Sequence, residues 1–142
     1  MTAGTISASL RSALAAAARH RCGYCKTSEL VTGAPLEVEH LAPRSRGGTS
    51  VEENLWLACR LCNAHKSDRI QARDPRTGQF AALFNPRRDD WSAHFRWSSD
   101  GLIVEGVTPQ GRATVEALGI NRPSLVVARR IWVAARWHPP QD

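Results

Sequence analysis

Two pairs of cysteines constrain this chain more than any other feature of its sequence. One pair is Cys22 and Cys25, the other is Cys59 and Cys62, and 33 residues separate the two pairs. A gap of two residues lets both sulfurs of a pair reach neighbouring corners of a tetrahedral zinc ion. The two pairs together predict a structural zinc site of four thiolates. The chain must then fold so that segments distant in sequence meet at the metal.

Other uses of four cysteines fit the sequence less well. Disulfides at these positions would suit a secreted, loop-rich protein, but no secretory signal precedes them, and we expect a cytoplasmic protein. A redox site of the thioredoxin type needs one such pair rather than two. Disulfides and redox-active thiols remain the alternatives. A closed four-thiolate site leaves zinc no open position for a substrate, so we expect this metal to hold the fold and do no chemistry.

The length and composition fit one globular domain. The chain has 142 residues, of which 42% are hydrophobic and 23% are charged. These values are near the globular average and exclude disordered and fibrous proteins. The longest apolar run is Ala13–Ala18, far short of the ~20 residues that cross a bilayer. We therefore expect no membrane-spanning helix and no membrane partner.

The first twenty residues are expected to form an N-terminal helix. They are rich in alanine, the best helix former, and Ser7 or Ser9 is available as the N-cap. The same Ala/Ser/Arg composition also resembles an organellar transit peptide, which stays the alternative. The segment leads directly into Cys22 without a cleavage pattern, which favours the helix.

The charge of the chain favours a nucleic-acid partner. Lysine and arginine number 19 against 13 acidic residues, a formal net charge of +6, and all the basic residues except Lys26 and Lys66 are arginine. Arginine makes forked, planar contacts with phosphate. A general bias toward arginine, with a merely soluble surface, is the alternative on charge alone.

The segment between and after the cysteine pairs predicts a strand, a loop, a second strand and a helix. Alternating apolar residues predict a strand at Leu36–Leu41, ended by Pro43. A basic loop with two glycines follows, and Ser50–Glu53 matches a capping box that would start one helical turn. The second extended piece is Leu55–Ala58. Residues 60–70 contain no helix breaker and predict a helix.

The string EVEHLAPRSRGGTSVEENLWLACRLCNAHKSD, within residues 22–68, resembles the core of the HNH nucleases, in their branch with CxxC pairs. The resemblance implies an α+β fold: a ββα-metal (His-Me) finger clipped by the four-cysteine zinc site, with flanking helices. It also implies an endonuclease that hydrolyses DNA phosphodiester bonds by a one-metal mechanism. The segment LFNPRRDDWSAHFRW is similar to an extension seen in one bacterial branch of the family.

The resemblance assigns catalytic roles to four residues. It implies that His40 is the general base, that Asn54 braces the loop and so orients the base, and that Glu39 and Asn63 hold a single Mg²⁺ or Mn²⁺. A neutral imidazole can take a proton from water at physiological pH, and a hard ion held by few protein oxygens keeps positions for phosphate and water. The chain departs from the family name because Asn63 stands where a histidine is named. It also carries Glu39 in place of the commoner aspartate.

Geometry bears on two of these assignments. Glu39 and His40 are adjacent on the predicted strand, so they can share one site only if the strand twists or ends there. Asn63 and His65 are about 200° apart around the predicted helix, so only one of them can face the ion. His65 is three residues after Cys62 and so falls on the zinc side. We assign the ion to Asn63 and expect His65 either on the helix surface or as a residue that supports a metal ligand.

Three basic residues are candidates for phosphate contacts. Arg44 and Arg46 lie in the basic loop, and Lys66 follows Asn63 by one helical turn. Each could instead be a solvated charge. The rival function is a zinc-stabilised nucleic-acid-binding module without catalysis, and a weaker third is a zinc ribbon for protein contacts only. The presence of Glu39, His40 and Asn63 beside the four cysteines favours the nuclease.

The expected layout is a single domain over residues 1–142. It comprises the N-terminal helix at residues 1–20, the HNH core with its zinc knuckles at 21–70 and a C-terminal extension at 71–142. In the extension we expect a turn at Asp74–Gly78, a hairpin, and a helix from Thr108 to Gly119. A last helix is expected from Pro123 to Arg136. Its predicted apolar stripe is Leu125, Ala128, Ile131, Trp132 and Ala135.

Overall fold

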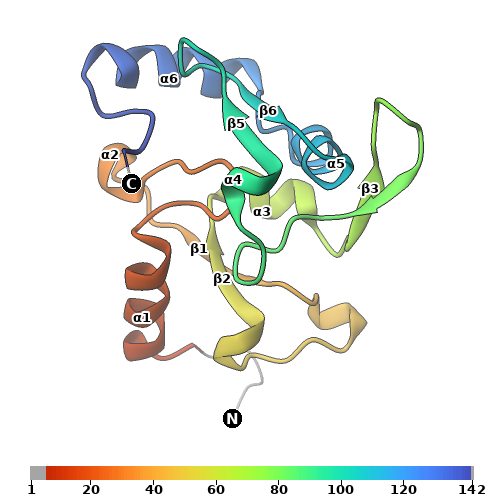
Figure 1. Ribbon diagram of the computed structural model, residues 1–142. Helices are drawn as coiled ribbons and strands as arrows, with labels where there is room; N and C mark the ends of the chain where they lie inside the picture. Colours follow the sequence, from red (N-terminus) through yellow and green to blue (C-terminus); the bar gives the residue numbers. More distant parts are fainter. Residues whose placement is uncertain (1–5, 142) are drawn as a thin grey trace. The chain divides into compact units, whose positions relative to one another are not determined.

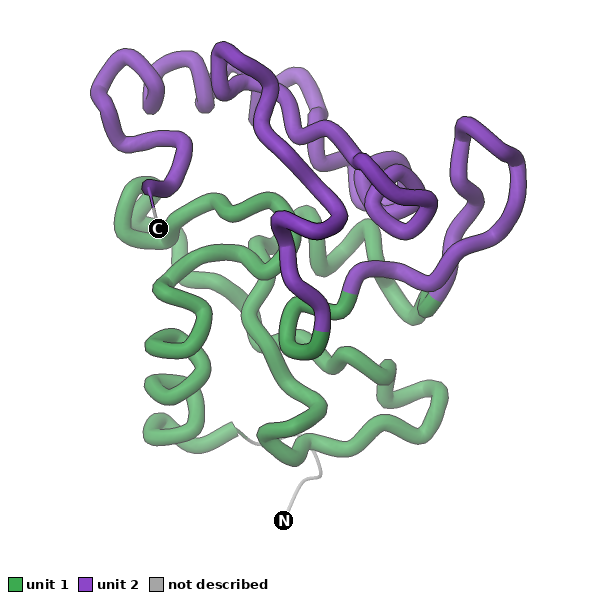
Figure 2. The backbone as a smooth tube through the Cα atoms, viewed as in Figure 1, with its two compact units in different colours: residues 1–70, 85–88 green, residues 71–84, 89–142 purple. Residues whose placement is uncertain are grey.

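The computed structural model describes residues 6–141 and shows an α+β chain with three separate two-stranded antiparallel sheets (Figure 1). The chain divides into two compact units (Figure 2). Unit 1 comprises residues 1–70 and 85–88, and unit 2 comprises residues 71–84 and 89–142. The return of residues 85–88 to the first unit was not expected from the sequence.

Unit 1 holds a hairpin and three helices. Its elements are α1 (Ala8–Ala18), α2 (Glu29–Thr32), β1 (Glu37–His40), β2 (Leu55–Ala58) and α3 (Arg60–Lys66), with 3₁₀ turns at Arg44–Arg46 and Glu52–Asn54. Strands β1 and β2 pair antiparallel, with His40 opposite Leu55. Helix α1 packs against β2, and α3 packs against β1. The hairpin is thereby covered by one helix from each end of the unit's sequence.

The core of unit 1 is formed by apolar residues of β2 and α1, whereas in β1 the buried residue is Glu39 and not Val38. Leu55 and Leu57 of β2 and Leu14 of α1 are buried, as expected of apolar residues on one face of a strand and one face of a helix. The N-cap of α1 is Ser7, whose hydroxyl accepts the Leu10 N–H at 3.1 Å. An amino-terminal helix with this cap is one of the two options that the sequence left open.

Two local predictions in unit 1 are wrong. The turn Glu52–Asn54 has Val51 at its N-cap and no side-chain cap bond, so the capping box of Ser50 and Glu53 does not form. Helix α3 ends at Lys66 rather than near residue 70, because Ser67 has a φ of 52°, a value that a right-handed helix cannot continue.

Residues 85–88 belong to unit 1 because they pack on β2. The Arg87 guanidinium donates to the carbonyl of Leu55 at 3.1 and 3.2 Å and lies over the Trp56 ring. Gly23, inside the first cysteine pair, is also part of this contact. A Cβ added at Gly23 would collide with Trp56 and Pro86, so the first pair requires glycine because of close packing.

Unit 2 contains two hairpins and three helices. Its elements are β3 (Gln71–Arg73), β4 (Phe80–Ala82), α4 (Trp91–His94), β5 (Phe95–Trp97), β6 (Val104–Gly106), α5 (Pro109–Leu118) and α6 (Pro123–Ala134). Thr108 caps α5 through its hydroxyl, and Gly119 ends it with a φ of 59°. The buried Asp74 pairs with Arg112 of α5 at 2.9 Å, so the β3–β4 turn is fixed to that helix.

The predicted apolar stripe of α6 is only partly correct. Leu125 is buried, but Ile131 is 61% exposed. The fully buried side chain of this helix is Arg129, which donates to the carbonyls of Leu102 and Ile120. A buried arginine is stable when its N–H groups are paired, so polar pairing with two loops, not apolar periodicity, decides which face of α6 is buried.

Among residues 6–141, no helix is both long and apolar enough to cross a lipid bilayer.

Candidate active site

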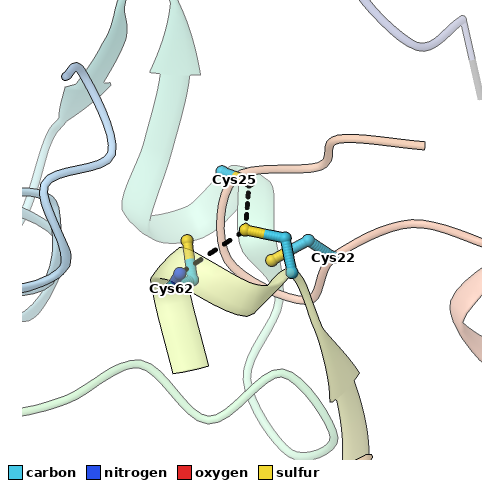
Figure 3. A group of neighbouring side chains, drawn as sticks. Cys22, Cys25 and Cys62 are labelled. Atoms are coloured by element: carbon cyan, nitrogen blue, oxygen red, sulfur yellow. Dashed lines mark hydrogen bonds between the residues drawn. The ribbon is translucent and has the colours of Figure 1, made fainter. Parts of the chain in front are cut away.

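The four cysteine sulfurs converge on one point of unit 1. Cys22 and Cys25 lie before α2, Cys59 is the N-cap of α3, and Cys62 lies in its first turn. All four Sγ atoms lie within 4.8 Å of one another, and Figure 3 shows the three labelled side chains pointing toward one another. The Sγ atoms of Cys25 and Cys59 are 3.7 Å apart. Tetrahedral Zn–S bonds of ~2.3 Å would put sulfurs about 3.8 Å apart, so the cluster fits zinc.

The electrostatics of the cluster also suit a cation. Hydrogen bonds from Cys22, Cys25 and Cys62 lower the pKa of the Cys59 thiol. Burial, with hydrogen bonds to other thiols, raises the pKa of Cys22. Four thiolates at this spacing would repel one another in a buried site, so full ionisation requires a bound positive ion.

His40 lies at the end of β1 and lines an open pocket of about 290 Å³. The pocket is also lined by Val38, Pro43, Arg44, Ser45, Asn63, Ser67 and Asp68. The Nε2 atom of His40 is 2.9 Å from the Ser50 hydroxyl. Burial, followed by the charges of Arg44 and Lys66, lowers the pKa of His40. The imidazole is therefore neutral near pH 7, the state that a general base requires.

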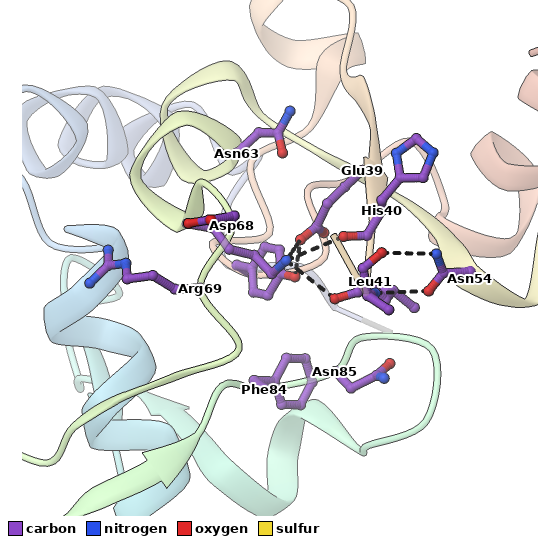
Figure 4. A network of polar contacts seen from close by, with 12 residues as sticks. Glu39, His40, Leu41, Asn54, Asn63, Asp68, Arg69, Phe84 and Asn85 are labelled. Atoms are coloured by element: carbon purple, nitrogen blue, oxygen red, sulfur yellow. Dashed lines mark hydrogen bonds and ion pairs between the residues drawn. The ribbon is translucent and has the colours of Figure 1, made fainter. Parts of the chain in front are cut away.

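Asn54 braces the loop that follows His40. Its Oδ1 accepts the Ala42 N–H at 2.8 Å, and its Nδ2 donates to the carbonyls of Ala42 and Thr49 at 3.0 and 2.8 Å. Figure 4 shows this amide beside the end of β1 at His40 and Leu41. One side chain thus joins both ends of the loop.

Glu39 lies on the other face of β1 from His40 and does not line the pocket. It is 2% exposed, and its Oε1 accepts the Tyr24 hydroxyl and pairs with the Lys66 ammonium at 3.1 Å. Burial raises the pKa of Glu39, against the opposing effects of Lys66 and Tyr24. The regular alternation of a strand is thus kept at β1. The strand does not twist enough to bring Glu39 and His40 to one surface.

Only part of the predicted catalytic metal site fits an ion in this arrangement. Among residues 6–141, the Oε2 of Glu39 is a buried oxygen without a hydrogen-bond partner, which suits a cation ligand. The Lys66 charge beside the same carboxylate opposes a second cation. Asn63 lines the His40 pocket and donates to Glu37 at 2.9 Å, whereas His65 is exposed. The helix thus directs Asn63, not His65, into the pocket.

Comparison with known proteins relates the segment that contains these residues to a protein family. The family model of the HNH endonucleases matches residues 22–69. This segment is an HNH domain. It contains both cysteine pairs, the β1–β2 hairpin, the loop that Asn54 braces and α3, and it agrees with a ββα-metal fold within the α+β chain.

A curated relative also resembles the chain. The Septu protein PtuB of Bacillus mycoides (strain KBAB4) is 28% identical over 136 residues. The match covers 77% of this chain and 45% of that protein, so the chain spans less than half of the relative's length. No solved structure is significantly similar to the chain.

The basic residues of the HNH domain differ in their solvent exposure and in their hydrogen-bond partners. Arg44 is exposed at the pocket, and Arg46 is exposed while its Nε donates to the carbonyl of Asp68 at 2.6 Å. Lys66 is 3% exposed. Its ammonium also contacts the carbonyls of His40 and Leu41 at 3.3 and 3.4 Å. The expectation that Lys66 contacts phosphate is not met, because its donors are directed at the protein interior.

Three polar residues of the HNH domain were not assigned roles from the sequence. Tyr24 donates to Glu39 from inside the first cysteine pair, Ser50 contacts the His40 ring, and Asp68 lines the pocket. Asp68 stands two residues after Lys66, in the string that carries the family resemblance. Nothing local distinguishes Tyr24 from a core aromatic residue or Ser50 from a helix cap, so only the tertiary contacts identify them.

Proposed function

We propose that this chain is a metal-dependent endonuclease that hydrolyses phosphodiester bonds in DNA. The observation that carries the proposal is the His40 pocket. A histidine whose pKa is lowered lies there beside an amide and an exposed arginine, within an HNH domain. Phosphodiester hydrolysis needs a base for the attacking water and positive charge for the phosphate. His40 and Arg44 supply these two groups in one concave surface.

In the proposed reaction, His40 accepts a proton from a water molecule as the water oxygen forms a bond to phosphorus. The bond from phosphorus to the leaving oxygen breaks, and that oxygen then takes up a proton. Arg44 and Arg46 bind backbone phosphates, while Asn54 keeps the loop that carries them in place. These roles use only the exposed donors of the loop and leave the buried Lys66 out.

Glu39 and Asn63 remain the proposed ligands of the catalytic ion, Mg²⁺ or Mn²⁺. This assignment requires the Glu39 carboxylate to leave the Lys66 ammonium and turn toward the pocket that Asn63 lines. When bound, such an ion would neutralise charge on the phosphate and on the leaving oxygen. The Oε2 of Glu39 and the Oδ1 of Asn63 are the hard oxygen atoms that these residues offer. The four cysteines are proposed to hold a structural zinc ion, and a reducing compartment such as the cytoplasm would keep their thiols available.

The second candidate function is a nucleic-acid-binding module without catalysis. The buried Glu39–Lys66 pair favours it, because a carboxylate that is already neutralised by an ammonium is a weaker ligand for a divalent ion. Zinc, Arg44 and Arg46 would serve this module as well as they serve a nuclease. The two functions differ in whether DNA is cut.

The first prediction separates the two candidates. His40→Ala should abolish Mg²⁺-dependent relaxation of a supercoiled plasmid while DNA affinity stays within about threefold of wild type, because the base acts in the transition state and phosphates are bound by arginines. Cleavage is followed on agarose gels, and affinity by fluorescence anisotropy. Cleavage by the variant at the wild-type rate would remove His40 from the mechanism. A wild-type protein that binds DNA without cutting it would favour the binding module.

A further inference from the structure

A hydroxyl group lies beside one of the two ring nitrogens of His40. The Nε2 of His40 lies 2.9 Å from the Oγ of Ser50, across the loop that connects β1 to β2. Both residues are half-buried, whereas most of the loop between them is exposed. We propose that Ser50 is a positioning residue for the general base. This inference rests on the nuclease function proposed above.

The loop has the rigidity that such a role requires. Asn54 donates to the carbonyl of Thr49, the residue directly before Ser50, and to that of Ala42. Gly48 packs so close to Ala42 that an added Cβ would collide with the Ala42 carbonyl oxygen. The Gly48 N–H also donates to the Pro43 carbonyl at 3.0 Å. The start and the end of the loop are therefore fixed to each other. The backbone of Ser50, directly after Thr49, is held in place as a result.

The opposite side of the strand end is fixed as well. The Lys66 ammonium contacts the carbonyls of His40 and Leu41, and the Leu41 N–H donates to the Asn54 carbonyl at 2.9 Å. The backbone of His40 is thus held independently of its side chain. What these bonds leave undetermined is rotation of the imidazole ring, and the Ser50 hydroxyl restricts that rotation.

The proposed role of His40 as a base requires one direction of this hydrogen bond. A neutral imidazole carries one N–H and one lone pair, and a hydroxyl can accept from the N–H. If the Nε2–H donates to Ser50 Oγ, the lone pair stays on Nδ1, where it can accept the proton of the attacking water. Hydrogen-bonded partners that orient a catalytic or metal-binding histidine commonly affect rates by ten- to a hundredfold.

The test uses three variants of the full chain with zinc bound. Ser50→Ala removes the hydroxyl, and Ser50→Thr retains it. Thr49→Ala is the matched control, since the loop uses the backbone carbonyl of Thr49 and not its exposed side chain. Steady-state cleavage of a plasmid gives kcat and KM. A second measurement follows the Nε2-bound proton of His40 in ¹⁵N-edited NMR spectra of the uncut protein at one fixed pH.

We expect Ser50→Ala to lower kcat about tenfold or more with KM within about twofold, since orientation of the base matters in the transition state and not for phosphate binding. Ser50→Thr should restore most of kcat, and Thr49→Ala should match wild type. The Nε2 proton should be visible in wild type and in Ser50→Thr, and lost to exchange with water in Ser50→Ala.

Two results would overturn the inference: an unchanged kcat in Ser50→Ala, or an unchanged Nε2 proton signal in that variant. If Ser50→Ala and Ser50→Thr both lose kcat, the retained hydroxyl of Ser50→Thr does not support the base, and the inference fails. If wild type itself does not cut DNA, the nuclease proposal fails. The NMR comparison then still decides whether Ser50 holds the His40 ring.

Discussion

Lys66 illustrates how much a single side chain can determine in this domain. An ammonium has three N–H groups, and the structure offers three acceptors: the Glu39 carboxylate and the carbonyls of His40 and Leu41. In Figure 4 the Glu39 carboxylate and the carbonyl oxygens of His40 and Leu41 lie close together. Lys66 thereby binds the last two residues of the strand that carries the proposed base and the residue directly after it. The planar fork of an arginine could not converge on three such acceptors in the same way.

Asn63 and His65 give the second prediction, which also belongs to the residue scale. Asn63 lines the His40 pocket, and His65 is exposed on α3. Asn63→Ala should lower Mg²⁺-dependent cleavage by roughly ten- to a hundredfold, as loss of a metal ligand or its partner commonly does. His65→Ala should leave the rate unchanged. Plasmid cleavage over a range of Mg²⁺ concentrations measures both. The reverse pattern would show that the proposed ion site uses the wrong side of the helix.

At the scale of elements, Glu29 joins three parts of unit 1. Its Oε1 accepts from the Arg11 guanidinium of α1 at 3.0 Å and from the Leu36 N–H at 2.9 Å. Its Oε2 is 2.7 Å from the Nδ1 of His20. Helix α1, helix α2 and the approach to β1 therefore share one carboxylate. The sequence gives no hint of this role, because Glu29 looks like an ordinary first-turn acid of a short helix.

The third prediction concerns the acid stability of this junction. Burial alone would raise the pKa of Glu29, but hydrogen bonds from Leu36, His20 and Arg11 lower it from 4.5 to about 2. The carboxylate therefore stabilises the fold above pH 4.5, and this contribution is lost as the pH falls through about 2. Glu29→Gln should be less stable than wild type at pH 7.

The difference in unfolding free energy between Glu29→Gln and wild type should shrink as the pH is lowered from 4.5 toward 2. Urea denaturation at a series of pH values, followed by circular dichroism, measures it. Glu105→Gln is a suitable control, since the Arg96–Glu105 pair lies in unit 2, with Arg96 exposed and Glu105 half-buried. If the difference in unfolding free energy stays constant across this pH range, ionisation of Glu29 does not stabilise the junction.

At the scale of the whole molecule, the two units differ in what stabilises them. Unit 1 contains all four cysteines, and its hairpin and α3 meet at the sulfur cluster. Unit 2 contains no cysteine and is held by the buried Asp74–Arg112 pair and by Arg129. A bound metal contributes folding energy only to the part of the chain that ligates it. The units should therefore respond differently to metal removal.

The fourth prediction follows from this difference. The purified chain should contain one tightly held zinc ion, measured by elemental analysis. Removal of zinc with a chelator, or the change Cys59→Ser, should abolish hydrogen-exchange protection in β1, β2 and α3 and with it any cleavage activity. Helix α5 should keep its protection. A folded, zinc-free protein with four titratable thiols would contradict the zinc assignment, and simultaneous loss of protection in α5 would contradict independent units.

The sequence by itself determined the features that depend on a few neighbouring residues. The spacing within each cysteine pair fixed which sulfurs can share a metal. Thr108 fixed where one helix begins, and Gly119 fixed where it ends. The string around His40 and Asn54 was sufficient to indicate an HNH domain, which the family match confirms. Caps, turns and ligand pairs are local because their hydrogen bonds or metal bonds close over two to four residues.

Only the tertiary structure decided which partner each polar side chain finds. Lys66 is buried against Glu39 rather than exposed to phosphate, Ser50 contacts His40 rather than capping a turn, and Arg129 occupies the buried face of α6 where Ile131 was expected. In each case the partner lies eight or more residues away along the chain. A buried donor or acceptor must be paired, and the fold alone brings such distant groups within hydrogen-bonding distance.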